Sequence, residues 1–153
     1  MKHNVVCALR AVGFVVLGAV GQGALAEALT GIVMVELAGL KAVSGDVFVA
    51  VYDSDATWLG DDAVAVQKVV IADALDGDLV RTELQLPMGE YALSAFYDRD
   101  GDGELTTNFI GMPREPIGLS NNAVGKFGPP SYSDAVFTLG AEPIIQSIIM
   151  RDM

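Results

Sequence analysis

The sequence predicts an all-β protein, organised as a single antiparallel β-sandwich of about seven strands. Two observations lead to this class. After residue 26, apolar residues recur with a period close to two, which is the period of a strand and not of a helix. Glycine, proline, aspartate and asparagine separate these apolar segments at short intervals, as expected for strands joined by turns.

Seven segments fit strands, and the pattern of each indicates which faces it buries. The segment 46–53 has apolar residues on both sides, which favours a central strand. The segment 79–86 alternates polar and apolar residues, so one of its faces meets water. Pro87 and Gly89 then form a tight turn into a second central strand. The expected strands are 29–37, 46–53, 64–72, 79–86, 90–98, 135–139 and 143–150.

Residues 109–135 interrupt this pattern. They contain four prolines and four glycines and show no periodicity. An irregular segment of this length inside a compact domain is usually functional or flexible. Seven short strands joined by turns indicate a sandwich of immunoglobulin-like or transthyretin-like type.

The N-terminus predicts export. Lys2 and Arg10 precede a run of ten apolar residues, and Ala24-Leu25-Ala26 offers a small-x-small cleavage site. The apolar run is shorter than the ~20 residues that a spanning helix needs. We therefore expect a signal peptide at 1–26, a β-sandwich domain at 27–153, and a periplasmic or secreted protein without membrane insertion after cleavage. An uncleaved anchor is the alternative.

Cleavage would remove a large part of the chain's possible chemistry. Cys7 and His3, the only cysteine and histidine, lie within 1–26. The remaining domain would lack the ligands and nucleophiles of zinc sites, haem sites and Ser-His-Asp or Cys-His enzymes. The full chain carries a net charge of −11, which argues against nucleic acid and anionic membrane surfaces as partners.

The segment 97–108, YDRDGDGELTTN, predicts a calcium loop. Asp98, Asp100 and Asp102 occupy alternate positions and Gly103 follows where a calcium loop turns sharply. Glu104 would offer its backbone carbonyl, and Thr106 would ligate directly or through water. Leu105 is expected to tie the loop to the core. Phe109 stands where an EF-hand has its bidentate glutamate, so the loop is not an EF-hand.

The missing carboxylate would have to come from elsewhere, and Glu115 and Asp134 are the candidates. The alternative is a plain turn, in which aspartate side chains bond their own backbone. A second alternative is a carboxylate-based glycan hydrolase using Asp98, Asp100 or Glu115. Against it, the chain has a single tryptophan and few aromatic platforms for a sugar.

The long segment also offers five candidates for ligand binding or for organising the loop: Arg114, Glu115, Asn121, Asn122 and Asp134. Arg114 and Glu115 lie between Pro113 and Pro116, which stiffen the backbone around them. Arg114 would either pair with the aspartates or recognise a ligand. Asn121 and Asn122 would cap, turn, or lend carbonyl oxygens to a metal.

The C-terminal half resembles the bacterial family called domain of unknown function 2141. The shared pattern comprises L-P-x-G-x-Y-A, an Asp-rich turn, G-x-P-x-E-x-x-G-x-S-N-N and P-P-x-[FY]-x-D-A, and it is dense over residues 86–139. The resemblance implies an exported single-domain protein with a β-sandwich. Thr106 is a departure, since family members often carry aspartate there. The matching positions are Pro87, Gly89, Tyr91, Asp98, Asp100, Asp102, Gly103, Gly111, Pro113, Glu115, Gly118, Ser120, Asn121, Asn122 and Asp134.

The sequence therefore predicts a non-enzymatic exported binding or accessory module. Its aspartate loop would bind calcium and organise residues 109–135 into a surface for a ligand or protein partner. The alternatives are the hydrolase and a small carrier of an apolar ligand. The identity of the partner and the oligomeric state remain open.

Overall fold

A computed structural model describes residues 29–41 and 44–152. The expected signal peptide at 1–26 lies outside the described residues. The described chain forms strands in two sheets, with only short helical turns between them. The strands are β1 (Thr30–Ala38), β2 (Asp46–Tyr52), β3 (Ala65–Val70), β4 (Leu75–Asp76), β5 (Leu79–Pro87), β6 (Gly89–Asp98), β7 (Ile117–Leu119), β8 (Phe137–Leu139) and β9 (Ile144–Ile149). The helices are α1 (Ile71–Ala74), the 3-10 turn η1 (Ser120–Asn122) and α2 (Tyr132–Ala135).

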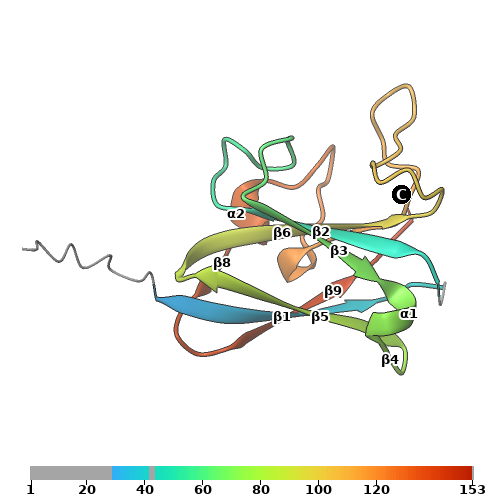
Figure 1. The fold of residues 1–153 in the computed structure, drawn as a ribbon. Helices are drawn as coiled ribbons and strands as arrows, with labels where there is room; N and C mark the ends of the chain where they lie inside the picture. The colour runs from blue at the N-terminus through green and yellow to red at the C-terminus, as the bar shows by residue number, and fades with distance from the viewer. Residues whose placement is uncertain (1–28, 42–43, 153) are drawn as a thin grey trace, which may run out of the picture.

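The two sheets lie one above the other (Figure 1). The first has the strand order β4-β5-β1-β9, and the second has the order β3-β2-β6-β7, with β8 also paired to β6. All pairs are antiparallel except β1 with β9. The last strand, β9, therefore lies beside the first, β1.

The core lies between the sheets and follows from the alternation of side chains along each strand. Alternate residues of β1 and of β2, from Val33 to Leu37 and from Val47 to Val51, are fully buried. Leu93 of β6 and Ile148 of β9 complete the same cluster. Burying a side chain of this size stabilises the fold by about 1.5–3 kcal/mol. The core can therefore hold the domain without disulfides.

The prediction of an all-β fold with two sheets is confirmed, but the sheets are not wholly antiparallel as expected, because β1 and β9 are parallel. Each of the seven expected segments contains a strand, but the structure has nine strands over the described residues, so the expected number is too low. The two additional strands are β4 and β7. β7 lies inside the segment 109–135, which also contains η1 and α2 and is less irregular than expected.

Strand β7 escaped prediction because it is short and centred on a glycine. Gly118 packs so closely on β9 that a Cβ atom there would lie 2.5 Å from a side-chain carbon of Ile148. Only glycine permits this approach, and a three-residue strand around a glycine has no recognisable period.

Three connecting segments extend from the outer side of the β2-β6 sheet (Figure 1). They are 53–64, 99–116 and 123–131. Trp58 of the first donates a hydrogen bond from Nε1 to the Pro130 carbonyl of the third, at 2.9 Å. The segment 99–116 stands apart from them, at the opposite end of the sheet.

Within the described part of the chain, no helix is long and apolar enough to cross a membrane.

Candidate cation site

The aspartate loop, residues 98–106, begins where strand β6 ends. Asp98 is the last residue of β6 and is buried, with 4% of its surface exposed. Gly101 and Gly103 follow with φ angles of 79° and 80°. These angles lie in the left-handed region, which glycine enters without steric cost. The loop can therefore turn back over Asp98.

The carboxylate of Asp98 holds this turn in place. Its Oδ1 accepts a hydrogen bond from the Gly101 N–H at 2.7 Å, and its Oδ2 accepts one from the Gly103 N–H at 2.9 Å. A carboxylate that accepts two backbone N–H groups makes strong, charge-assisted hydrogen bonds. The backbone of the loop is thus fixed by its own first residue.

The remaining acidic side chains of the loop use only part of their oxygens for backbone contacts. Asp102 Oδ1 accepts from the Glu104 N–H at 2.8 Å. Asp100 Oδ1 accepts a long bond from the Asp102 N–H at 3.4 Å, and its Oδ2 accepts from the Thr106 hydroxyl at 3.3 Å. Each carboxylate oxygen has two lone pairs, so most of the acceptor capacity of Asp100 and Asp102 is left over.

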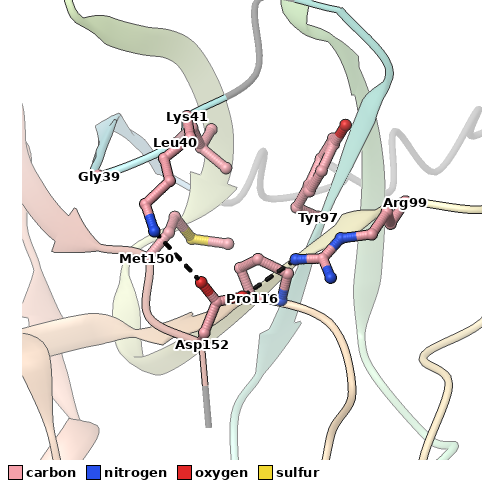
Figure 2. A pocket seen from close by; sticks show the side chains of 8 residues that line it. All are labelled: Gly39, Leu40, Lys41, Tyr97, Arg99, Pro116, Met150 and Asp152. Atoms are coloured by element: carbon pink, nitrogen blue, oxygen red, sulfur yellow. Dashed lines mark hydrogen bonds and ion pairs between the residues drawn. The ribbon is translucent and has the colours of Figure 1, made fainter.

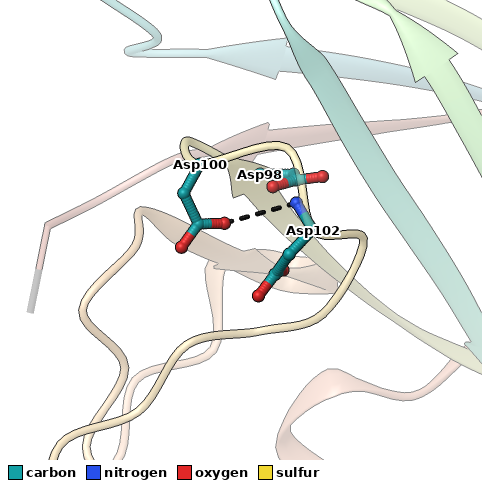
Figure 3. Close-up of side chains that lie close together, drawn as sticks. All are labelled: Asp98, Asp100 and Asp102. Carbon is teal, nitrogen blue, oxygen red and sulfur yellow. Dashed lines mark hydrogen bonds between the residues drawn. The ribbon is translucent and has the colours of Figure 1, made fainter.

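The three aspartates bring their carboxylates to one place (Figure 3). One oxygen from each of Asp98, Asp100 and Asp102 lies within 4.8 Å of the others, and Asp100 and Asp102 are exposed. Two like charges at such a separation repel by about 1 kcal/mol even in water. Among the described residues, none of the ion pairs involves these three carboxylates. The cluster therefore gathers hard oxygen donors, and no ion pair of the described residues compensates their negative charge.

Glu115 reaches the loop, but not as a member of the carboxylate cluster. Its side chain is 3% exposed; Oε1 accepts from the Arg99 N–H at 2.6 Å and Oε2 from the Thr106 N–H at 3.1 Å. Arg99 and Thr106 stand at the two ends of the loop. Glu115 therefore clamps the loop closed, and the expectation that it supplies the missing metal ligand is not supported by its position.

The prediction that Asp134 reaches the loop is wrong. Asp134 belongs to α2, where its Oδ2 accepts from the hydroxyl of Ser131 at 2.6 Å and from the Ser131 N–H at 3.1 Å. These two hydrogen bonds hold the pKa of the Asp134 carboxyl below its usual range. Asp134 is therefore a helix-capping residue.

Arg114 does not pair with the aspartates. The ion pairs of the described residues do not include it, and its backbone N–H donates to the Thr106 carbonyl at 2.9 Å. Its side chain lines an open groove of about 560 Å³ beside the loop. Asp100, Thr106 and Glu115 also line this groove, so any ligand held there would contact the aspartate loop and Arg114 together.

Leu105 differs from its expected role, whereas the expected role of Glu104 stays a prediction. Leu105 is 38% exposed, so it does not tie the loop to the core as expected. Instead, Gly103 lies over Phe48 of β2, where a Cβ atom would come within 3.8 Å of the ring. Glu104 is exposed and donates its N–H to Asp102. Its carbonyl stays a predicted ligand.

Asn121 and Asn122 organise the chain and do not approach the aspartate loop in any hydrogen bond of the described residues. Both adopt left-handed backbone angles, with φ of 56° and 52°. The Asn122 side chain donates to the Ser147 carbonyl at 2.9 Å and accepts from the Ile149 N–H at 2.8 Å, which closes the outer edge of β9. Asn121 donates to the Val136 carbonyl at 2.8 Å.

Ser120 is the buried residue of the same turn, and its role was not predicted. It is fully buried; its hydroxyl accepts from the Leu93 N–H at 2.9 Å and donates to the Ala135 carbonyl at 2.6 Å. These bonds join β6 to α2. A serine within a polar S-N-N run carries no sequence feature that separates a buried bridge from an exposed turn.

Comparisons with known proteins place the chain in a family but add no activity. No curated protein matches it. A solved structure of a leucine-rich repeat protein from Bacteroides thetaiotaomicron is similar over 80% of this chain and 12% of that one, with 11% identity and a TM-score of 0.42. A likeness this weak indicates nothing about the function of this chain. The sequence pattern of a family described as uncharacterized proteins conserved in bacteria, DUF2141, matches residues 35–146. These residues contain both the aspartate loop and the Ser120–Asn122 turn, and the chain belongs to this family.

Proposed function

We propose that this protein is an exported, non-enzymatic binding module whose aspartate loop holds a calcium ion. The ion would neutralise the carboxylates at the base of the segment 99–116, and this segment would serve as a recognition surface. The observation that carries the proposal is the convergence of three carboxylates within 4.8 Å without a cationic side chain paired to any of them among the described residues.

The chemistry of the loop fits calcium better than other common cations. Calcium accepts six to eight oxygen ligands in flexible geometry, including carboxylates, backbone carbonyls, hydroxyls and water. Asp100 and Asp102 retain free acceptor capacity, and the Thr106 hydroxyl lies beside Asp100. The Glu104 carbonyl would add one more oxygen. Thr106 stands where family members often carry aspartate, and no further carboxylate joins the cluster. We therefore expect the loop to bind calcium weakly, with a Kd on the order of 0.1–1 mM, as extracellular calcium sites do.

The alternative of a carboxylate-based hydrolase gains no support from the geometry. Glycosidases hold two carboxyl groups about 5–10 Å apart across the sugar, whereas the three aspartates lie within 4.8 Å of one another. Glu115 is 3% exposed and its two oxygens join the two ends of the loop, so burial limits the access of a substrate to its carboxylate. The carrier alternative would need an apolar cavity, and no specific observation favours it.

The proposal also includes the type of β-sandwich and the compartment of the protein. Two mainly antiparallel sheets with a closed core support an immunoglobulin-like or transthyretin-like sandwich. Export to the periplasm or medium rests on the sequence of residues 1–26. The weak calcium affinity expected for this loop would suit a compartment outside the cytosol.

The test is calorimetric titration of calcium into the purified protein, compared with the variants Asp100→Asn and Asp134→Asn. Both variants remove one exposed negative charge, but only Asp100 belongs to the loop. We expect saturable binding that Asp100→Asn weakens at least about tenfold and Asp134→Asn leaves unchanged. If both variants bind calcium like the wild type, the loop is a plain acidic turn.

A control for ionic strength is needed because the chain has a net charge of −11. Any salt screens the mutual repulsion of such a chain and stabilises it without a site. Magnesium chloride at equal concentration provides the control, since magnesium demands tighter octahedral geometry and retains its water.

A further inference from the structure

The segment 107–113 forms a short, stiff hairpin that carries apolar side chains at its tip. Thr107 pairs with Pro113, and the Asn108 N–H donates to the Met112 carbonyl at 2.8 Å. The Asn108 side chain accepts from the N–H groups of Ile110 and Met112, each at 3.0 Å. A loop with this many internal hydrogen bonds has one preferred shape, and its tip is thereby presented in a fixed direction.

The tip exposes more apolar surface than its position on a loop requires. Phe109 is 96% exposed, Ile110 64% and Met112 44%. Between Glu104 and Arg114 the sequence contains no charged residue. A phenylalanine ring buries on the order of 150–250 Å² when it finds a partner. Contiguous exposed apolar patches of this kind mark interaction surfaces on soluble proteins.

The same end of the molecule contains a groove that complements the tip. The Met150 groove, of about 330 Å³, has an apolar floor that includes Leu40, Pro116 and Met150. Lys41 and Arg99 approach it from opposite sides (Figure 2). This volume is sufficient for an aromatic side chain. Arg99, which lines the groove, belongs to the segment 99–116 that also contains the hairpin.

The charges around the two surfaces are complementary. Asp100, Asp102 and Glu104 are exposed at the base of the hairpin. Lys41 and Arg99, with side chains 90% and 55% exposed, share the single carboxylate of Asp152, from which they lie 3.8 Å and 3.0 Å away. The groove therefore keeps one net positive charge in a chain of net charge −11. Local attraction of this kind sets the orientation of docking.

We propose that a second copy of this chain is the partner of the hairpin: the 107–113 hairpin of each copy inserts Phe109 into the Met150 groove of the other. Hairpin and groove lie at the same end of the molecule, so a two-fold axis allows both contacts to form together. Two hairpins and two grooves bring the buried surface toward the ~1,000 Å² that a specific interface needs.

A bilayer fits the observations less well than a second copy. Insertion of the tip would bring Asp100, Asp102 and Glu104 close to the headgroups, where anionic lipids repel carboxylates. The groove and its two cations would remain unexplained. The proposal goes beyond the calcium site and does not require it, because Glu115 and Asn108 hold the segment through protein contacts alone.

Sedimentation equilibrium of the purified protein, in EDTA and separately in calcium, tests the proposal. The N-terminus of the sample is first identified by mass spectrometry. Over about 1 µM to 1 mM protein, we expect a monomer–dimer equilibrium that Phe109→Ser weakens by ~30-fold or more. Phe127→Ser is the matched control, since Phe127 is fully exposed on another loop and takes no part in the contact. Equal weakening by both variants would overturn the proposal, as would a wild type that stays monomeric.

A double variant distinguishes mutual insertion from other dimers. Lys41→Glu reverses a groove charge at an exposed position, and by itself it should weaken the dimer. If Phe109 enters the groove beside Lys41, the two substitutions act on the same contact, so their effects on the free energy of association are not additive. We expect the double variant Phe109→Ser/Lys41→Glu to weaken the dimer by less than the product of the two single fold-changes. Effects that simply multiply would overturn mutual insertion, and Phe109-dependent flotation with phosphatidylcholine vesicles by a monomeric protein would assign the tip to lipid instead.

Discussion

The aspartate loop and the Ser120–Asn122 turn are both dense polar clusters, yet they differ in how much of their hydrogen-bonding capacity the protein uses. In the turn, the side chains of Ser120, Asn121 and Asn122 all bond to backbone groups of neighbouring elements. In the loop, Asp100 and Asp102 use few of their lone pairs, and their charges are not compensated by an ion pair among the described residues.

This difference separates a structural polar cluster from a candidate binding site. A buried polar group that is fully bonded stabilises one conformation, and nothing remains for a ligand. A cluster of carboxylates with free lone pairs is destabilised by repulsion until a cation arrives. Mutations in the turn should therefore change stability and leave calcium binding intact, and mutations in the loop should do the opposite.

The largest effect on stability is expected from Ser120→Ala. It leaves the buried Leu93 N–H and Ala135 carbonyl without their partner. Each unsatisfied buried group costs about 1–3 kcal/mol, so we expect a loss of ~2–3 kcal/mol in the free energy of unfolding. Urea unfolding in EDTA measures this loss. If the variant also loses its stabilisation by calcium, the turn and the loop are not independent as stated above.

Glu115→Gln should combine both effects, because Glu115 is a buried clamp on the loop. The amide keeps one acceptor for the N–H groups of Arg99 and Thr106 and faces the other with a donor. We expect a loss of about 1.5–2 kcal/mol together with weaker calcium binding. Glu104→Gln, at an exposed position in the same loop, is the control for the change in charge. Equal stability losses in the two variants would argue against the clamp.

Asn122→Gly tests the edge of β9. Glycine retains the left-handed backbone but removes the two side-chain bonds to Ser147 and Ile149. Because the site is partly solvated, we expect a loss of only about 1 kcal/mol. Hydrogen exchange of the Ile149 amide should accelerate with it. An unchanged exchange rate would show that Asn122 does not protect this edge.

The fold was more predictable than the site because strands produce a periodic pattern of apolar residues in the sequence, whereas hydrogen-bond partners produce no such pattern. The alternation in 46–53 and 79–86 located β2 and β5, and the spacing of Asp98, Asp100 and Asp102 located the loop. Nothing in the sequence distinguishes Glu115, which accepts backbone N–H groups, from a metal ligand.

The same limit explains the error at Asp134 and the alternatives left open at Asn122. Asp134 was near enough in sequence to serve the loop, but its position three residues after Ser131 gives it a cap of its own. Asn122 carries an oxygen suited to a metal, yet that oxygen accepts from Ile149 of β9. Which acceptor meets which donor depends on contacts between distant segments, and a single sequence does not record these.

Asp102→Asn should leave stability in EDTA nearly unchanged while removing the response to calcium. Asparagine keeps the oxygen that accepts from Glu104 and relieves repulsion in the cluster. Calcium at about ten times its Kd should stabilise the wild type by ~1.4 kcal/mol, and this gain should disappear in the variant. Thermal unfolding with and without calcium measures both quantities. A retained gain would mean that the cation binds elsewhere.

The smallest expected effect concerns acid stability at Asp134. Its hydrogen bonds with Ser131 place the folded-state pKa below the ordinary value of 3.8. The ionised carboxylate therefore contributes stability above pH 3.8, and this contribution is lost as the pH falls through the folded-state pKa. Asp134→Asn should remove this part of the acid dependence without changing calcium binding. An acid-unfolding profile that matches the wild type would contradict the cap.

The most direct test of the central claim is a calcium titration followed residue by residue in ¹H–¹⁵N NMR spectra. We expect saturable shifts of the Gly101, Gly103 and Glu104 amides, whose N–H groups bond to Asp98 and Asp102, with the amides of Leu93 and Ile149 beside the Ser120–Asn122 turn unmoved. Asp102→Asn should abolish the shifts. Loop amides that do not respond to calcium, or that move no more than Leu93 and Ile149, would contradict the assignment of the aspartate loop as a cation site.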